Sequence, residues 1–348
     1  MPDFVSSVWN PTIFTGKVVF CTGGNGSICS NQVRALVYLG ADACIVGRNV
    51  EKTESVAKDI ATVRPNSRVL GIGAVDVRSI ESLKSAIDTC VSQLGGIDFL
   101  IAGAAGNFLA PLEQLSPNAF KSVIDIDVLG SYNVTKLALP HLVESARKWN
   151  ETSSLPKTNS TSNNNASTSG STSGASSSAS SAFGSASAGP GGRIIYVSAT
   201  IHYTGLPLQT HVAVAKAGVD ALSNNVAIEY GPLGITSNVI APGPIAGTEG
   251  MDRLSKQPSK NEKHPSKRIP LGRWGLVKEI ADATIYLFSD AANYVTAQTL
   301  VVDGGAWRTS GAADGPGRGF EYPDFLLSGQ QVSGVKGLKT KKEEKAKL

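Results

Sequence analysis

Short apolar runs alternate with longer amphipathic stretches along most of this chain. The apolar runs predict seven strands, at residues 18–22, 43–47, 69–75, 97–102, 193–198, 236–241 and 300–303. Helical periodicity predicts helices that begin near Ser27, Glu51, Ile80, Pro117, Gln209 and Leu276. Near-continuous apolar strands that alternate with helices are typical of a parallel sheet covered on both faces. The pattern therefore predicts an α/β fold, a Rossmann-like, doubly wound sheet of seven parallel strands.

A low-complexity segment interrupts this alternation. Residues 151–191 are dominated by Ser, Thr, Asn, Gly and Ala, a composition that buries too little apolar surface to offset the entropy of ordering. We therefore predict a single domain from residues 1–150 and 192–310, a disordered insertion at 151–191 and a C-terminal tail at 311–348. Because the insertion follows a helix and precedes a strand, we expect it at the edge of the sheet opposite the ligand site.

The composition excludes several classes of protein. The 348 residues carry a formal charge of +4, and lysines of the C-terminal tail account for much of it, so nucleic-acid binding is not expected. No apolar run reaches the ~18–20 residues of a membrane span, and the first residues lack the pattern of a secretion signal. The 4 cysteines lack metal-ligand spacing, which predicts buried, reduced thiols and no metal site.

A glycine-rich turn follows the first predicted strand and opens a helix. Glycines at such a turn let the backbone approach a pyrophosphate, and the helix N-terminus supplies free N–H groups and the positive end of its dipole. The turn therefore predicts a dinucleotide site, with a tight turn that binds no ligand as the alternative. The residues of this predicted site are Thr22, Gly23, Gly24, Asn25, Gly26, Ser27 and Ile28.

The end of the second predicted strand distinguishes between NAD and NADP. An acidic residue there would bind the ribose 2′-hydroxyl, whereas a basic residue accommodates a 2′-phosphate. The strand ends in Gly47, Arg48 and Asn49, without a carboxylate, and the planar guanidinium of Arg48 suits a phosphate. We therefore predict NADP(H) as the cofactor; a solvated loop arginine is the alternative.

The glycine-rich turn resembles the TGxxxGxG motif of the short-chain dehydrogenase/reductase family. Ser27 and Cys29 stand where that motif has its second and third glycines, which leaves the pose of the pyrophosphate open. The resemblance implies further cofactor contacts after the third, fourth and sixth strands. These positions are Asp76, Val77, Ala104, Pro242, Gly243, Ile245 and Thr248.

The same resemblance identifies the catalytic positions. Family members that act on alcohols and ketones use a Ser, a Tyr and a Lys. Lys216 aligns with that Lys, but Val212 and Ala199 stand in place of the Tyr and the Ser. Asp127 replaces a family Asn on the long helix after the fourth strand. A carboxylate near a buried lysine couples the two protonation states and can hold a water for proton transfer, although a purely structural ion pair is the alternative.

These departures resemble the peroxisomal branch of the 2,4-dienoyl-CoA reductases. The similarity covers about residues 10–310 apart from the low-complexity segment. It is carried by residues 103–108, 115–121, 123–127, 197–200, 211–216, 241–245, 247–250 and 301–307. It implies NADPH-dependent reduction of a 2,4-dienoyl-CoA to a 3-enoyl-CoA, an auxiliary step of β-oxidation. Hydride would add at the δ-carbon and a proton at the α-carbon, so that no carbonyl oxygen has to be fully protonated.

The resemblance also implies roles for individual residues. Asp127 and Lys216 would hold the water that delivers the proton, and Lys216 would also bind the nicotinamide ribose. His211 would contact the substrate; the alternative is that it is a helix cap or a packed surface residue. The basic stretch at 251–268 resembles a substrate lid, with a solvated face as the alternative. A homodimer or homotetramer is implied. The implied substrate contacts are Asn107, Phe108, Ser198, Thr200 and His211.

The chain ends in Ala346, Lys347 and Leu348, a close variant of the Ser-Lys-Leu peroxisomal address that a receptor reads from a free terminus. We therefore predict import into the peroxisomal matrix through the import receptor. Three hypotheses follow from the sequence as a whole: a peroxisomal 2,4-dienoyl-CoA reductase, another acyl-CoA or carbonyl reductase of the same fold, and a non-catalytic NADP-binding subunit.

Overall fold

Seven parallel strands form one sheet in the order β3-β2-β1-β4-β5-β6-β7, which confirms the predicted fold class. The computed structural model describes residues 3–152, 191–254 and 269–309. Every neighbouring pair is parallel, and the order reverses between β1 and β4, where the first and second halves of the sheet meet. The strands are β1 (Val18–Thr22), β2 (Asp42–Val46), β3 (Val69–Ile72), β4 (Phe99–Ala102), β5 (Arg193–Val197), β6 (Thr236–Pro242) and β7 (Thr299–Val302).

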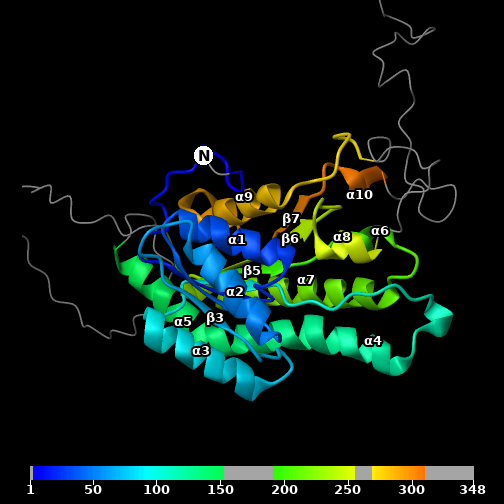
Figure 1. The fold of residues 1–348 in the computed structure, drawn as a ribbon, viewed down its shortest axis with the longest axis horizontal. Coiled ribbons are helices and arrows are strands. Elements are labelled where there is room, and N and C mark those ends of the chain that lie inside the picture. The colour runs from blue at the N-terminus through cyan, green and yellow to red at the C-terminus, as the bar shows by residue number, and fades with distance from the viewer. Residues whose placement is uncertain (1–2, 153–190, 255–268, 310–348) are drawn as a thin grey trace, which may run out of the picture.

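Helices cover both faces of the sheet (Figure 1). The longer ones are α1 (Ser27–Tyr38), α2 (Val50–Ala61), α3 (Ile80–Leu94), α4 (Pro117–Ile124), α5 (Gly130–Thr152), α7 (Thr210–Tyr230) and α9 (Val277–Phe288). The short elements are η1 (Leu112–Gln114), η2 (Asp125–Leu129), α6 (Ile201–Thr204), η3 (Gly231–Leu233), α8 (Glu249–Leu254), η5 (Asp290–Ala292) and α10 (Ala306–Thr309). One apolar core joins α1, α2 and α9 to the sheet, and a second core on the other face joins α3, α5 and α7.

The predicted strands agree with the observed ones to within a few residues. The largest difference is in the third strand, which ends at Ile72 rather than at residue 75. Ala74 has φ 56°, a left-handed conformation that a ladder of extended residues cannot accommodate. The chain therefore turns there toward Asp76.

The cysteines are buried and none of them forms a disulfide. Within the described ranges, no helix is long and apolar enough to cross a bilayer.

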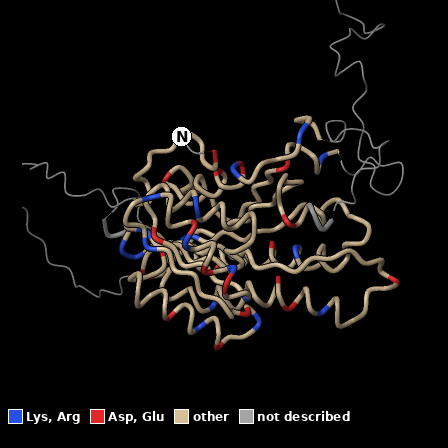
Figure 2. The backbone as a smooth tube through the Cα atoms, in the orientation of Figure 1, with Lys and Arg blue, Asp and Glu red and all other residues tan. Residues whose placement is uncertain are grey.

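Three predicted segments lie wholly or mostly outside the described residues. These are the insertion (153–190), the lid (255–268) and the tail with its tripeptide (310–348). Figure 2 shows the positions of acidic and basic residues interspersed along the backbone.

Candidate active site

A buried ion pair joins two helices near the carboxyl ends of β4 and β5. Lys216 Nζ on α7 lies 3.0 Å from Asp127 Oδ2 and donates to the Val197 carbonyl, also at 3.0 Å. The other carboxylate oxygen of Asp127 accepts the backbone N–H of Gly106 at 2.7 Å. Asp127 is fully buried, so this pair stands in a low-dielectric environment where both charges need a partner. The structure therefore brings together the two residues that the sequence identified as catalytic.

Neither member of this pair has used all of its hydrogen-bonding capacity. An ammonium has three N–H donors, and two of those of Lys216 face Asp127 and Val197. Asp127 Oδ2 lies within ion-pair distance of Lys216 but accepts no well-aligned hydrogen bond from the described residues. A donor and an acceptor are thus available side by side, which is the pairing that an ordered water requires.

A π-helical segment, η2, carries Asp127. It lies between α4 and α5, so that the three elements run on from Pro117 to Thr152. π-Helical turns are rare in proteins as a whole, but those that occur are frequently at functional sites. The residue pattern identifies the carboxylate but does not predict this distortion of the helix.

Val212, which stands where the family has its Tyr, lies among apolar side chains. Val212 is buried and packs in a small core with Val123 and Ala215. Ala199, at the other departure from the family pattern, supplies only a methyl group. The proton donor to a carbonyl oxygen and its hydrogen-bonding partner, the Tyr and the Ser of family members that act on ketones, are therefore both replaced by apolar groups.

The loop after β4 is tied to the start of α7. The Phe108 carbonyl accepts from Gln209 Nε2 and faces His211 Nε2, both at 3.0 Å, and the Ala110 N–H donates to the Leu208 carbonyl at 3.1 Å. The His211 ring also stacks on the Phe108 ring, with centroids 4.2 Å apart. Because a carbonyl can only accept, His211 Nε2 carries a proton, and Nδ1 is a buried acceptor in the neutral ring.

Burial lowers the pKa of His211 against the opposing effects of the Phe108 carbonyl and the Asp127 charge, and so favours the neutral ring. The side chain is fully buried. Its observed contacts fix a loop at the site, and its predicted contact with the substrate stays a prediction. Asn107 is exposed on this loop, and Phe108 is 37% exposed.

The glycine-rich turn opens α1 without a capping side chain. Gly26 is the N-cap residue and has no side-chain hydrogen bond to offer, and the first turn of α1 has no acidic residue. Gly23 has φ +65°, and a Cβ there would lie 2.9 Å from the backbone of Ala104. The turn is thus tightly packed against the loop after β4, while its uncapped N–H groups remain open to an anion.

Arg48 follows β2 and is exposed. Within the part of the chain that the structure describes, it has no ion-pair partner. Asn49 instead caps α2, by accepting from the Lys52 N–H at 2.8 Å.

Asp76, after β3, is paired with Arg78, and the hydrogen bonds from Arg78 lower the pKa of the Asp76 carboxyl to about 2. Asp76 is therefore ionised at neutral pH, and the Arg48 charge adds to this effect.

Other predicted contact residues have their side chains engaged within the protein. The Thr22 hydroxyl accepts the backbone N–H groups of Gly103 and Ala104, at 3.2 and 3.3 Å. The Thr248 hydroxyl donates to the Ile245 carbonyl at 2.9 Å and is buried. Their hydroxyls hold the cofactor loops in place, which is a role that sequence reasoning did not assign to them.

The structure also shows a polar cluster that sequence reasoning missed. Asp220, one turn beyond Lys216 on α7, is buried and accepts from Tyr203 Oη at 2.6 Å; its other neighbour is His202 Nε2 at 2.8 Å. Burial acts to raise the pKa of Asp220, but hydrogen bonding by His202, Ser198 and Tyr203 outweighs it and lowers the pKa. The cluster anchors the four-residue helix α6 to α7 beside Ser198, which is buried.

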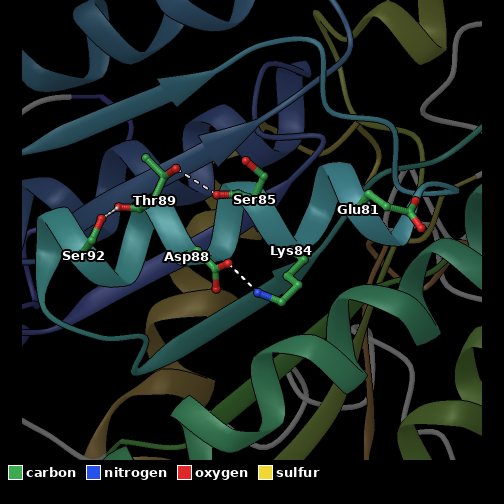
Figure 3. Close-up of a pocket in the computed structure, with 6 residues that line it drawn as sticks. All are labelled: Glu81, Lys84, Ser85, Asp88, Thr89 and Ser92. Atoms are coloured by element: carbon green, nitrogen blue, oxygen red, sulfur yellow. Dashed lines mark hydrogen bonds and ion pairs between the residues drawn. The ribbon is translucent and has the colours of Figure 1, made fainter.

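A shallow depression on α3 is open to solvent, unlike the buried polar groups near the strand ends. Its walls are Glu81, Lys84, Ser85, Asp88, Thr89 and Ser92. All six belong to one helix, and Figure 3 shows them along its open side. Lys84 and Asp88 form an exposed i,i+4 pair there. No side chain from a strand end converges on this surface, so it carries no catalytic arrangement.

Similarity to known proteins agrees with this architecture. A model of the short chain dehydrogenase family matches residues 17–183, and one described as enoyl-(acyl carrier protein) reductase matches residues 169–306. The solved structure of levodione reductase has a TM-score of 0.67 and 23% identity, covering 85% of this chain and 99% of its own. The chain therefore belongs to the short-chain dehydrogenase family.

Curated relatives extend over nearly the whole chain. The (3E)-enoyl-CoA-producing peroxisomal 2,4-dienoyl-CoA reductase of Saccharomyces cerevisiae is 46% identical over 321 residues, which cover 92% of each chain. The enzyme of that name from Danio rerio is 36% identical over 303 residues, 87% of this chain and 85% of its own. A probable (2E)-enoyl-CoA-producing reductase of Bacillus subtilis is 30% identical and covers 84% of this chain and 96% of its own. Within its family, the chain thus belongs with the peroxisomal 2,4-dienoyl-CoA reductases.

Proposed function

We propose that this protein reduces 2,4-dienoyl-CoA thioesters to (3E)-enoyl-CoA with NADPH in the peroxisomal matrix. The observation that carries the proposal is the Asp127–Lys216 pair, which is buried at the carboxyl edge of the sheet while Val212 and Ala199 replace the usual hydroxyl donors. Such a site lacks the acid for a ketone oxygen and retains groups that can hold water. The names of the curated relatives support the same substrate and compartment.

The described residues fit a nicotinamide dinucleotide. The uncapped start of α1 suits the pyrophosphate. The third N–H of Lys216 is proposed for a ribose hydroxyl, and the N–H that faces Asp127 Oδ2 without an aligned hydrogen bond is proposed for the water. The exposed Arg48, with no carboxylate beside it at the end of β2, favours NADP(H) over NAD(H). The other proposed contacts line the loops after β3, β4 and β6. When bound, the reduced cofactor supplies the hydride for C5 of the dienoyl chain.

The residues of this chain then have to stabilise a dienolate and protonate it. The C5–H bond forms as the two double bonds shift to C3=C4 and an enolate, and the charge develops on the thioester oxygen. Hydrogen-bond donors at that oxygen lower the barrier, and the hydroxyls of Ser198 and Thr200 are the proposed donors. A water held by Asp127 Oδ2 and the Lys216 ammonium gives a proton to C2 and takes one from the ammonium, which leaves the 3-enoyl product. Solvent then returns a proton to Lys216.

The substrate side of the site has an apolar rim. Two loops that are hydrogen-bonded to each other carry the partly exposed apolar side chains Phe108, Leu109, Leu206 and Leu208. We assign this rim to the acyl chain, because burial of its methylenes stabilises binding by about 0.8 kcal/mol each. Asn107 and His211 complete the proposed substrate contacts.

The remaining elements of the proposal concern assembly and location. We retain a homodimer or homotetramer, a single catalytic domain with an insertion at 151–191, and import through the tripeptide Ala346–Leu348 as proposals. The tripeptide lies outside the described residues, so its support comes from the sequence and from the names of the relatives.

A substrate panel tests the proposed function. NADPH oxidation is followed with a 2,4-dienoyl-CoA, a 2-enoyl-CoA and a 3-oxoacyl-CoA of equal chain length. We expect turnover with the dienoyl thioester and a (3E) product on chromatography. Turnover confined to the other two thioesters would refute the assignment, and NADPH binding without any turnover would indicate a non-catalytic subunit.

A further inference from the structure

A set of contacts beside the glycine-rich turn joins three elements that are far apart in sequence. Lys52, in the first turn of α2, forms an ion pair with Glu249, the first residue of α8. The backbone N–H of Glu249 donates to the Ser27 hydroxyl at 3.2 Å, at the start of α1. Ser27 is one of the two residues that replace a glycine of the family motif, and none of its proposed roles uses the hydroxyl.

Further hydrogen bonds close these contacts into a ring. Asn25 Nδ2 donates to the Thr53 hydroxyl at 2.9 Å, so the glycine-rich turn is also tied to α2 directly. The Thr53 hydroxyl in turn donates to the Asn49 carbonyl at 2.6 Å. The path from Ser27 through Glu249, Lys52 and Thr53 therefore returns to the glycine-rich turn at Asn25. The ring includes the uncapped start of α1 at Ser27. It passes next to the end of β2, because a Cβ on Gly47 would lie 2.6 Å from Asn25 Nδ2 and 2.8 Å from the Thr53 hydroxyl.

We propose that Ser27, Lys52 and Glu249 form a clasp that closes α8 over the pyrophosphate and adenosine half of the cofactor and slows its release. The proposal rests on the cofactor site proposed above. The ring spans the two places, the start of α1 and the end of β2, that hold these parts of a dinucleotide in such a fold. A ligand seated there leaves only when the Lys52–Glu249 contact opens.

The clasp makes a prediction that charge alone does not. The cofactor is an anion, so by simple electrostatics Lys52→Met weakens its binding and Glu249→Ala strengthens it. If the two residues form a clasp, both substitutions speed cofactor release. Their side chains are 42% and 49% exposed, and exposed pairs contribute modestly. We therefore expect an increase of about two- to fivefold in the release rate for each variant, which corresponds to the strength of such a pair.

The test is a double-mutant cycle on the dissociation rate of NADPH and of NADH, measured by stopped-flow fluorescence on the full chain. The double variant should release the cofactor no faster than either single variant. Lys52→Arg should restore slow release, and Ser27→Gly, which introduces the family residue, should speed it. The matched control is Lys84→Met, which breaks an exposed pair on the outer face of α3 (Figure 3). Thermal unfolding checks that each variant is folded.

The outcomes separate the clasp from its alternatives. Faster release in both single variants, without additivity, supports the clasp. Slower or unchanged release in Glu249→Ala overturns it, because Lys52 then acts on the cofactor through its charge. Rates that match the Lys84→Met control also overturn it. If the wild-type chain bound neither nucleotide, the cofactor site itself would be refuted, and the clasp with it.

Discussion

Replacement of Asp127 by Asn tests the central pair with the smallest change of shape. The Gly106 N–H keeps its acceptor in the Asp127→Asn variant, because the amide oxygen can take the place of Oδ1. The other position becomes an NH₂ group, which faces the Lys216 ammonium at 3.0 Å and can only donate. The substitution therefore removes the acceptor for the proposed water and leaves Lys216 with the Val197 carbonyl alone.

The expected magnitude follows from these contacts. Loss of positioned proton transfer costs about 10²–10⁴ in kcat, which is about 3–5 kcal/mol in the barrier. Breaking a buried pair costs up to about 3–5 kcal/mol of unfolding free energy. We expect the lower end, about 3 kcal/mol, because Lys216 retains a hydrogen bond to Val197 and is not fully buried.

Steady-state kinetics, with NADPH binding measured by fluorescence and stability by urea unfolding, separate these effects. We expect the Asp127→Asn protein to lose kcat while it binds NADPH as tightly as the wild type. The double variant with Lys216→Met should lose no more kcat than the worse single variant, because residues that act as a unit are not additive. If Asp127→Asn retained kcat within about threefold, or lost NADPH affinity in parallel with kcat, the pair would be structural.

Three further predictions address the cofactor, the second polar cluster and the tail. Arg48→Ser should weaken NADPH binding about ten- to a hundredfold and leave NADH binding unchanged; equal loss of both in calorimetry would show that Arg48 does not read the 2′-phosphate. Asp220→Asn should lower the unfolding free energy by about 1.5–3 kcal/mol at pH 7, because Asp220 holds His202 and Tyr203. Since the folded-state pKa of Asp220 is lowered, this difference should be complete above the unfolded-state pKa of about 3.9 and should be lost progressively as the pH falls from there through the lower folded-state pKa; a pH-independent difference in urea unfolding would contradict the reasoning. Deletion of residues 346–348 should leave kcat unchanged and abolish peroxisomal import in fluorescence microscopy, and import without the tripeptide would refute its role.

Much of the fold could be predicted because its signals are local. A buried parallel strand needs a short apolar run, and a covering helix needs one apolar face, so both appear in the order of residues along the chain. The strand boundaries were less predictable. Residues 73–75 continue the apolar run of β3, but the conformation of Ala74 ends the strand after Ile72.

The candidate site was predictable only in part. Lys216 and Asp127 could be identified from motif positions, since side-chain types carry that information. Their supporting partners could not, because the Gly106 N–H and the Val197 carbonyl are backbone groups that every residue has. The tautomer of His211 likewise depends on a carbonyl in another loop.

The sequence by itself determined the class of fold, the position of the glycine-rich turn and the absence of the usual Tyr and Ser. These features depend on the order of residue types, which local periodicity and motif spacing record. Only the tertiary structure decided that Asp127 faces Lys216 from a π-helical turn, that Asp220 anchors α6, and that the Glu249 N–H donates to the Ser27 hydroxyl. The first and last of these pairs are far apart along the chain, and the members of each pair lie on different helices, so only the packing of the helices brings them within hydrogen-bonding distance.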